Sequence, residues 1–572
     1  MRFLLPLWLV TAGTAAAQTG SSDVPTVAPS PSEERDPIIR ALQWELNRSM
    51  NQLSLPDAPG PYFVSYLLYD THDVHVTAQL GGVVSSSDER DRTLGGAVRV
   101  GDPSFDSANF DAIGGAGFGS RNVVPGDHGP ALRHDAWLLT DDLYKDAVEN
   151  LSRKQAAAQR RAQPDPVPDF APGPAQTADA EPVPAQEAQQ LTELARSLSA
   201  VFLTHPQVEW SIVYAASESG RRIHLDSLGT RVVEPVAEVS IRAVAVTRAE
   251  DGSTLTDQVL WVVRTLSDLP PTEDMLQSVH ALAEGLEQWR ALPAVDGEYV
   301  GPVLFEGDAA VDLFRHLLIP ALQGTPEPEQ PPRGSRTVVW DEGEGSSAIR
   351  VRRRILPSGF EVEDDPTADP SLPSAYRYDF EGEPAQNVKL VEDGVVRSHY
   401  ATRTPSKDVS ASNGHGRTFP GRLVRGTASW LRVSPAHTLS SRKLHRQAIR
   451  LAQEYEQDHY IVLRKLTEPS VDGIYGGPSF VIRDSYFGSD GGFPHPVVAL
   501  RVYADGREER VRGLHLSGIS LRTLRDIVGS TDSTTASRLL PPASMDHGGA
   551  TYGLPTTLTV PNVLVSEVEL SG

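Results

Sequence analysis

A single glutamate, Glu306, is the residue of this chain whose position most directly raises the question of catalysis. The stretch Gly301–Ala310 reads Gly-Pro-Val-Leu-Phe-Glu-Gly-Asp-Ala-Ala, an apolar strand followed by an amphipathic run that should stop at Pro320. A zinc peptidase would place a His-Glu pair here, with the glutamate acting as general base on a metal-bound water. Instead Phe305 precedes the glutamate, and His316 lies nearly three helical turns beyond it. The segment predicts a hydrolase scaffold without metal ligands, and a structural role at the helix start is favoured over catalysis.

The remaining sequence offers no other complete catalytic motif. It contains no Gly-x-Ser-x-Gly, no Walker A loop, no Rossmann glycine fingerprint and no His-Glu-x-x-His. The closest histidine pair, His72 and His75, falls on an expected strand, where an offset of three residues points the two rings to opposite faces. The chain has no cysteine, which excludes disulfides, thiolate zinc ligands, iron–sulfur clusters and cysteine nucleophiles.

One glycine-rich loop is a candidate ligand loop. Asn413, Gly414, His415, Gly416 and Arg417 are consecutive, and the two glycines leave the backbone amides beside the imidazole accessible to whatever approaches. These five residues are therefore candidates for lining a peptide-binding cleft. A tight loop that requires positive φ is the simpler interpretation, and the residues alone favour it.

Composition and the first residues bear on partners and location. The formal net charge of -23 disfavours nucleic acid as a partner, because phosphate binding needs clustered Lys and Arg.

Residues 1–17 combine Arg2, an apolar run and three alanines, which predicts a secretory signal peptide cut after Ala17. Retention as an uncleaved anchor stays open. No later stretch is apolar enough to span a membrane. We therefore expect an exported, periplasmic protein with no transmembrane segment in its mature chain.

The elements that position Glu306 suggest two domains. After a flexible lead at residues 18–35, residues 36–300 alternate helices with strands, and a Pro/Ala-rich linker is expected at about 164–190. Residues 301–572 are rich in strands and turns. The predicted fold class is α+β, with helices packed on antiparallel sheet in the first domain and a β-rich second domain. The expected helices span residues 140–161, 187–203, 272–292, 441–457 and 520–528, besides one opened by Asp36-Pro37, and the first strands span 62–69, 74–85 and 94–100.

The order and spacing of several segments resemble the TldD/PmbA family of metallopeptidase-related proteins. The matching segments are Val84–Asp88 with Leu94–Asp102, Leu225–Thr230, Gly301–Glu306, Asp379–Val395, Asn413–Arg417 and Pro561–Val568. The resemblance covers most of the chain beyond the signal. It implies an α+β N-terminal domain, a half-barrel-like, β-rich C-terminal domain, and dimerisation.

The resemblance also gives the vacant positions a meaning. In the TldD branch a helix carries His-Glu-x-x-x-His, a late cysteine completes the zinc site, and extended peptides enter a cleft between domains. Position by position, the two histidines fall on Phe305 and Ala310, the glutamate falls on Glu306, and the cysteine has no counterpart. All three metal ligands are absent, so no bound metal or other cofactor is expected. The pattern is similar to the PmbA (TldE) side of the family, which lacks the metal motif and partners the catalytic subunit.

Three hypotheses follow from these observations. The favoured one is a non-catalytic exported protein that binds extended peptides or dimerises, either with itself or with a TldD-like subunit. The second is an active peptidase with a relocated zinc site, in which His415 or another histidine converges on Glu306. The third is an envelope structural or interaction protein that keeps the fold for other ends.

Overall fold

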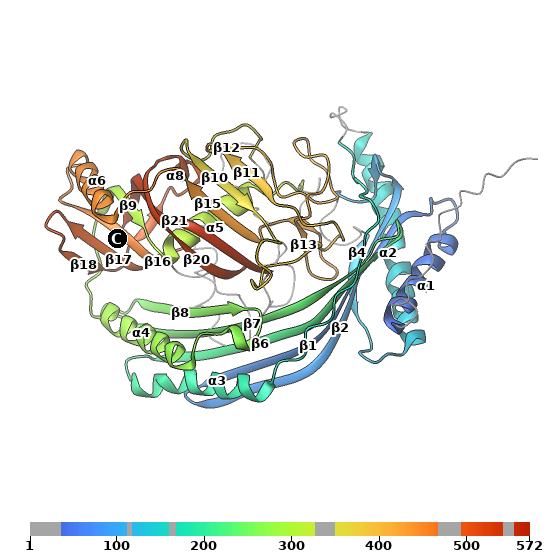
Figure 1. Cartoon of the computed structure of the whole chain (residues 1–572), viewed down its shortest axis with the longest axis horizontal. Helices are drawn as coiled ribbons and strands as arrows, with labels where there is room; N and C mark the ends of the chain where they lie inside the picture. Colours follow the sequence, from blue (N-terminus) through green and yellow to red (C-terminus); the bar gives the residue numbers. More distant parts are fainter. Residues whose placement is uncertain (1–35, 111–116, 160–166, 327–348, 467–492, 541–553) are drawn as a thin grey trace, which may run out of the picture.

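The structure is a computed structural model that describes residues 36–110, 117–159, 167–326, 349–466, 493–540 and 554–572. The expected signal peptide and flexible lead, residues 1–35, lie outside the described residues. Two large sheets divide the rest, and the predicted α+β class is confirmed (Figure 1). No helix within the described ranges combines the length and apolar character needed to cross a membrane.

The first sheet carries long strands that are mostly antiparallel. Its strands are β1 (Pro61–Gln79), β2 (Gly82–Asp102), β3 (Phe105–Asp106), β4 (Phe118–Asn122), β5 (Thr177–Ala178), β6 (Trp210–Asp226), β7 (Arg231–Arg248) and β8 (Thr254–Val263). The main order is β3-β2-β1-β6-β7-β5, with β4 beside β2 and β8 beside β7. The short β5 lies within the expected linker and pairs in parallel with β7.

Four helices cover the outer face of this sheet (Figure 1). They are α1 (Pro37–Gln52), α2 (Gly129–Ala158), α3 (Ala188–Ala200) and α4 (Thr272–Arg290). Asp36 caps α1 as expected, because its carboxylate accepts the backbone N–H groups of Ile38 and Ile39. Helices α1 and α2 pack on one end of the sheet, and α3 and α4 pack on the other.

The strand prediction at the start of this sheet is wrong in one respect. The segments 62–69 and 74–85 are not two strands, because β1 runs unbroken from Pro61 to Gln79 and turns at Leu80-Gly81, where both φ angles are positive. Asp70, in the middle of β1, does not interrupt the strand. Its carboxylate is buried but paired with Arg92 at 3.0 Å, so it does not have to be exposed to water.

The second sheet is mixed, and its described strands leave it open at both ends. Its main order is β12-β11-β10-β15-β21-β9-β16-β17-β18, with β19 and β20 beside β21. The strands are β9 (Glu298–Phe305), β10 (Phe360–Asp364), β11 (Val388–Glu392), β12 (Val395–Val396), β15 (Trp430–Pro435), β16 (His459–Leu466), β17 (Pro496–Tyr503), β18 (Glu508–Val511), β19 (His515–Ser517), β20 (Ile527–Leu540) and β21 (Leu554–Ser571). A separate pair joins β13 (Gly416–Arg417) to β14 (Arg425–Gly426).

Helices lie on both faces of this second sheet. Helix α5 (Asp308–Ala321) belongs to the largest core cluster, whereas α6 (Ser441–Glu454) packs on the opposite face against Leu304 and Leu564. Pro320 lies in the last turn of α5, one residue before its end, and does not stop the helix earlier. The expected helix at 520–528 shortens to α8 (Leu521–Arg525), because β20 begins at Ile527.

The two domains meet closely at the inner face of the first sheet (Figure 1). Leu67 and Tyr69 of β1 pack there with Phe380 and Leu554 of the second domain. Nearby, a Cβ atom added to Gly95 of β2 would lie only 2.7 Å from the backbone nitrogen of Gly421. This contact requires glycine, so the sequence itself is adapted to a tight junction between the domains.

Candidate functional site

The two positions that the resemblance assigns to zinc ligands are both apolar core. Phe305 ends β9, between β16 and β21, and its side chain is fully buried. Ala310 is fully buried in the first turns of α5 and belongs to the same core cluster. Neither side chain has an atom that could bind a metal. Phe305 and Ala310 pack against the surrounding apolar side chains of this core cluster.

Glu306 lies between β9 and α5 and is held by a cation. Its backbone N–H donates to the carbonyl of Leu463 at 2.9 Å, and its half-buried carboxylate accepts from Arg464 Nε at 3.1 Å. Arg464 also contacts Glu508 at 3.3 Å. The residue that caps α5 is Gly307, which has a positive φ of 56°, and the acid in the first turn is Asp308. Glu306 therefore precedes the cap, and an arginine rather than a metal neutralises it.

The histidines considered for a relocated site do not contact Glu306. The ring of His316 packs edge-on against Phe493, with 5.6 Å between ring centroids. His415 contacts Asp364, as described below. Within the described residues, no group of three or more His, Cys, Asp or Glu side chains is arranged to hold a metal ion. The hypothesis of a relocated zinc site thus gains no support from this part of the chain.

A groove runs between the domains beside the start of α5. One wall is β8, from Gln258 to Val263, and the other is formed mainly by Asp308, Asp312, Lys465 and Arg538. We call this cavity of about 370 Å³ the β8 groove. Its charged groups are paired within its walls: Lys465 contacts Asp257 at 2.6 Å, and Arg538 contacts Asp308 at 2.8 Å.

The strands beside the β8 groove are sheet edges. Among the described strands β8 pairs only with β7, and β20, which supplies Arg538, pairs only with β21. The outward backbone N–H and C=O groups of such a strand can pair with an added extended chain. The β8 groove thus lies beside two strands that each pair on one side only among the described strands.

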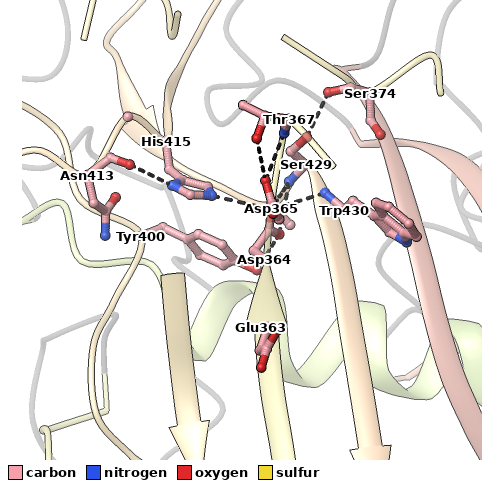
Figure 2. A network of polar contacts seen from close by, with 12 residues as sticks. Glu363, Asp364, Asp365, Thr367, Ser374, Tyr400, Asn413, His415, Ser429 and Trp430 are labelled. Atoms are coloured by element: carbon pink, nitrogen blue, oxygen red, sulfur yellow. Dashed lines mark hydrogen bonds and ion pairs between the residues drawn. The ribbon is translucent and has the colours of Figure 1, made fainter. Parts of the chain in front are cut away.

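The glycine-rich loop is buried and held by a network of hydrogen bonds (Figure 2). His415 is fully buried; its Nε2 lies 3.3 Å from Asp364 Oδ1, its Nδ1 lies 3.1 Å from the carbonyl of Asn413, and its ring packs on Tyr400. Asp364 also accepts the backbone N–H of Trp430 at 3.0 Å. Gly414 has a φ of 73°, and a Cβ there would lie 2.2 Å from the carbonyl oxygen of Pro384.

The other loop candidates are equally enclosed. The Asn413 amide donates to the carbonyl of His399 at 2.7 Å, and Arg417 donates to the carbonyl of Pro555 at 2.8 Å. Burial lowers the pKa of the Arg417 guanidinium. Since Gly416 is buried as well, the loop presents no side chain to a ligand in this conformation. It fixes the strands around it.

An ion network that no sequence motif indicated joins the two domains. Arg403 is buried and contacts Asp226 of β6 at 2.7 Å and Glu383 at 2.6 Å. Burial opposes ionisation of Asp226, yet His224 and Arg403 together hold the pKa of its carboxyl well below the usual range. A second pair joins Glu234 of β7 to Arg377 at 2.8 Å. The Arg403–Asp226 and Arg377–Glu234 contacts link residues 177 and 143 positions apart, so spacing along the chain carries no signal for them.

Comparisons with known proteins agree with this architecture. A family model described as the PmbA/TldA metallopeptidase C-terminal domain matches residues 297–572. No curated protein sequence matches the chain.

Solved structures resemble nearly the whole chain. A candidate modulator of a DNA gyrase from Thermotoga maritima covers 89% of this chain and 95% of its own, at 16% identity and a TM-score of 0.53. TldE from Thermococcus kodakarensis covers 89% and 97%, at 13% identity and a TM-score of 0.54. A candidate modulator of DNA gyrase from Bacteroides thetaiotaomicron covers 93% and 98%, at 13% identity and a TM-score of 0.58. At these identities the likeness concerns the fold.

Proposed function

Because the chain belongs to the TldD/PmbA family, a membership carried by its C-terminal domain, we propose that it is an exported, non-catalytic member of that family. In this proposal it binds extended peptide segments, or it pairs with a TldD-like subunit that carries the metal. In this proposal the family name reflects the ancestry of the protein, and the function of the protein is to bind a polypeptide.

The burial of Phe305 and Ala310 carries the proposal. A zinc centre needs several nitrogen, sulfur or oxygen ligands that converge on one point. Here two of the three family ligand positions are fully buried hydrocarbon, and the chain contains no cysteine for the third. Without metal-bound water, Glu306 has no nucleophile to activate. Its contact with Arg464 further favours a structural role.

The β8 groove supports peptide binding. An extended chain placed along β8 would form main-chain hydrogen bonds to the outward edge of that strand, which give affinity without demanding one sequence. The Gln258 carbonyl on β8 already accepts from Lys465 Nζ at 2.7 Å, so the peptide would pair beyond that residue. The paired charges of the groove, Lys465 with Asp257 and Arg538 with Asp308, could exchange partners with charged side chains of the peptide. Export is proposed on the signal peptide expected at residues 1–17.

A hydrolysis assay with matched variants tests the absence of catalysis. Arg464 contacts both Glu306 and Glu508, so Glu306→Gln and Glu508→Gln each remove one charged partner of the same guanidinium. We expect purified wild-type protein and both variants to leave a quenched-fluorescent peptide library uncleaved. Turnover by the wild type that only Glu306→Gln abolishes would establish a catalytic base and overturn the proposal.

Pairing is tested separately by co-expression. A family member that carries His-Glu-x-x-x-His, when co-expressed in the same compartment, should co-purify in one complex of defined mass. Peptide binding is tested by titrating the purified protein with an unstructured decapeptide. If the protein binds neither the subunit nor the peptide, the proposal fails in both of its forms.

A further inference from the structure

A second pocket lies at the domain junction, and it shares no lining residue with the β8 groove. It lies between β1, β2 and β4 of the first domain and the loops near Phe380, Arg403 and Phe419 of the second. Its volume is about 100 Å³. Because one water molecule needs roughly 10–15 Å³ of such space, the pocket has room for about one amino-acid residue.

Most of the lining of this pocket is aromatic or aliphatic. We call it the phenylalanine pocket, after the residues Phe63, Leu67, Phe118, Phe170, Phe380 and Phe419. Small residues of β2, among them Gly95 and Ala97, form its floor and keep it open. Such a lining favours an apolar group, because burial of apolar surface supplies the driving force.

Several polar side chains also reach this lining, among them Glu381, Arg403 and His224, and two further cations, Arg99 and Arg422. Glu381 Oε2 accepts the backbone N–H of Arg403 at 2.7 Å, and the described residues provide no hydrogen bond to its Oε1. Burial raises the pKa of the Glu381 carboxyl, although Arg403 opposes the shift. A further cation at Oε1 would stabilise the ionised form of this carboxylate beyond what Arg403 and Arg99 already provide.

Arg403 needs an acceptor. Its Nε and Nη1 donate to Glu383 and Asp226, whereas Nη2 is buried with no hydrogen-bond partner in the described part of the chain. An unpaired buried donor costs about 1–3 kcal/mol, which an acceptor on a ligand would relieve.

The charge around Arg403 limits what that acceptor can be. Asp226 and Glu383 contact the guanidinium, and Glu381 accepts the backbone N–H of the same residue. Arg99 and Arg422 also line the pocket, so three carboxylates and three arginines nearly balance, and a neutral acceptor leaves that balance unchanged. A neutral carbonyl oxygen suits Arg403, and an ammonium group suits Glu381. An amino-terminal residue supplies both groups, two bonds apart, and adds a side chain.

We propose that the phenylalanine pocket binds the amino-terminal residue of a peptide whose first side chain is apolar. The α-ammonium group contacts Glu381, the first carbonyl oxygen accepts from Arg403, and the side chain enters the aromatic lining. The inference rests on the proposed peptide-binding function and adds to it a preference for free amino termini, which the β8 groove by itself does not provide.

Calorimetric titration with three short peptides tests the proposal. The probes are Leu-Gly-Gly-amide, its N-acetylated form, and Gly-Gly-Gly-amide, which differ in the amine or in the side chain alone. We expect Leu-Gly-Gly-amide to bind roughly tenfold more tightly than either of the others, the loss expected when one charged contact or one buried aliphatic group is removed. Equal affinity for the acetylated peptide would overturn the proposal.

Two variants locate the binding. Glu381→Gln keeps an acceptor for the N–H of Arg403 but removes the charge, and it should weaken Leu-Gly-Gly-amide roughly tenfold while leaving the acetylated peptide unchanged. Ala97→Leu should fill the pocket and abolish the preference for leucine. Glu392→Gln, at the partly exposed end of β11, is the matched control and should leave the affinity of all three peptides unchanged.

The outcomes separate this inference from the proposed function. If an acetylated decapeptide binds but the short free-amine peptides do not, peptide binding stands and the phenylalanine pocket is not its amino-terminal subsite. If no peptide of either kind binds, both the inference and the peptide-binding form of the proposed function fail. Thermal unfolding of each variant shows whether a loss of binding merely reflects a loss of fold.

Discussion

Phe305 shows at the scale of one residue why a zinc ligand does not fit at this position. It is fully buried between β16 and β21, and its ring packs in the largest core cluster of the protein. An imidazole there would fill less volume and bring polar nitrogen atoms that need partners. Ala310 has the opposite problem, because its fully buried position leaves no space for a larger side chain.

We therefore expect Phe305→His to lower the free energy of unfolding by about 3 kcal/mol, through lost packing and an unpaired polar group. Urea denaturation monitored by tryptophan fluorescence measures this loss. Phe419→His, at the half-buried domain junction, is the control and should cost less. A Phe305→His variant as stable as the wild type would show that the position tolerates a ligand.

At the scale of the element, four neighbouring strands place carboxylates in one row. Glu89 of β2 is the cross-strand partner of Asp73, Asp73 is the partner of Glu218, and Glu218 is the partner of Glu238 of β7. Like charges directly opposite each other on a sheet destabilise it. Burial, opposed by a hydrogen bond from Thr71, raises the pKa of Asp73 to about 6, and burial raises that of Glu238 to about 8.

These raised pKa values predict that stability falls as the pH rises. Between the ordinary pKa of glutamate, about 4.5, and a value of about 8, the folded protein keeps a proton on Glu238 that the unfolded chain has released. The free energy of unfolding should thus decrease by about 1 kcal/mol per pH unit over that range. Glu238→Gln should flatten this slope, as urea midpoints at pH 5, 6, 7 and 8 would reveal.

Glu284→Gln, an exposed substitution on α4, is the control for the carboxylate row and should leave the slope unchanged. A wild-type protein whose stability rises from pH 5 to pH 8 would contradict the assignment. So would a Glu238→Gln variant that keeps the full wild-type slope.

Local patterns predicted the helices better than the long strands. Helix α1 follows from the Asp36 cap and the apolar repeat, and α6 begins at Ser441 as its spacing indicates. The predicted strands 62–69 and 74–85 leave out residues 70–73, which the structure places inside β1. Asp70 is buried there because Arg92 from the next strand pairs with it. Whether a charged side chain can be buried depends on its partner, and the partner is known only once the strands are paired.

The candidate site follows the same rule. The sequence alone shows that Phe305 and Ala310 carry no metal-binding atom, because residue type decides that, whereas their assignment as ligand positions stays a prediction. The partner of Glu306 could not, since Arg464 lies 158 residues away along the chain. Nor could the burial of His415, which depends on its contact with Asp364 of β10.

At the scale of the whole molecule, buried ion pairs hold the two domains together. Removing one member of such a pair leaves an uncompensated charge in a poorly solvated junction. Arg403→Met should therefore lower the free energy of unfolding by about 3–5 kcal/mol, since Asp226 and Glu383 both lose their cation.

Limited proteolysis complements the unfolding measurement, because a loosened junction should expose linking segments to cleavage. Arg248→Met is the control: its pair with Glu209 is exposed and spans 3.7 Å, so its loss should cost less than about 1 kcal/mol. Equal effects of the two substitutions would mean that the Arg403 network does not stabilise the junction.

Zinc affinity of the purified wild-type protein tests the proposed absence of a metal centre most directly. The protein is stripped with chelator, then titrated with zinc against a chromophoric competitor, and its metal content is measured by mass spectrometry after dialysis. The account predicts substoichiometric zinc and no change in affinity on Glu306→Gln. One tightly held zinc ion per chain, accompanied by hydrolysis of peptides, would contradict it.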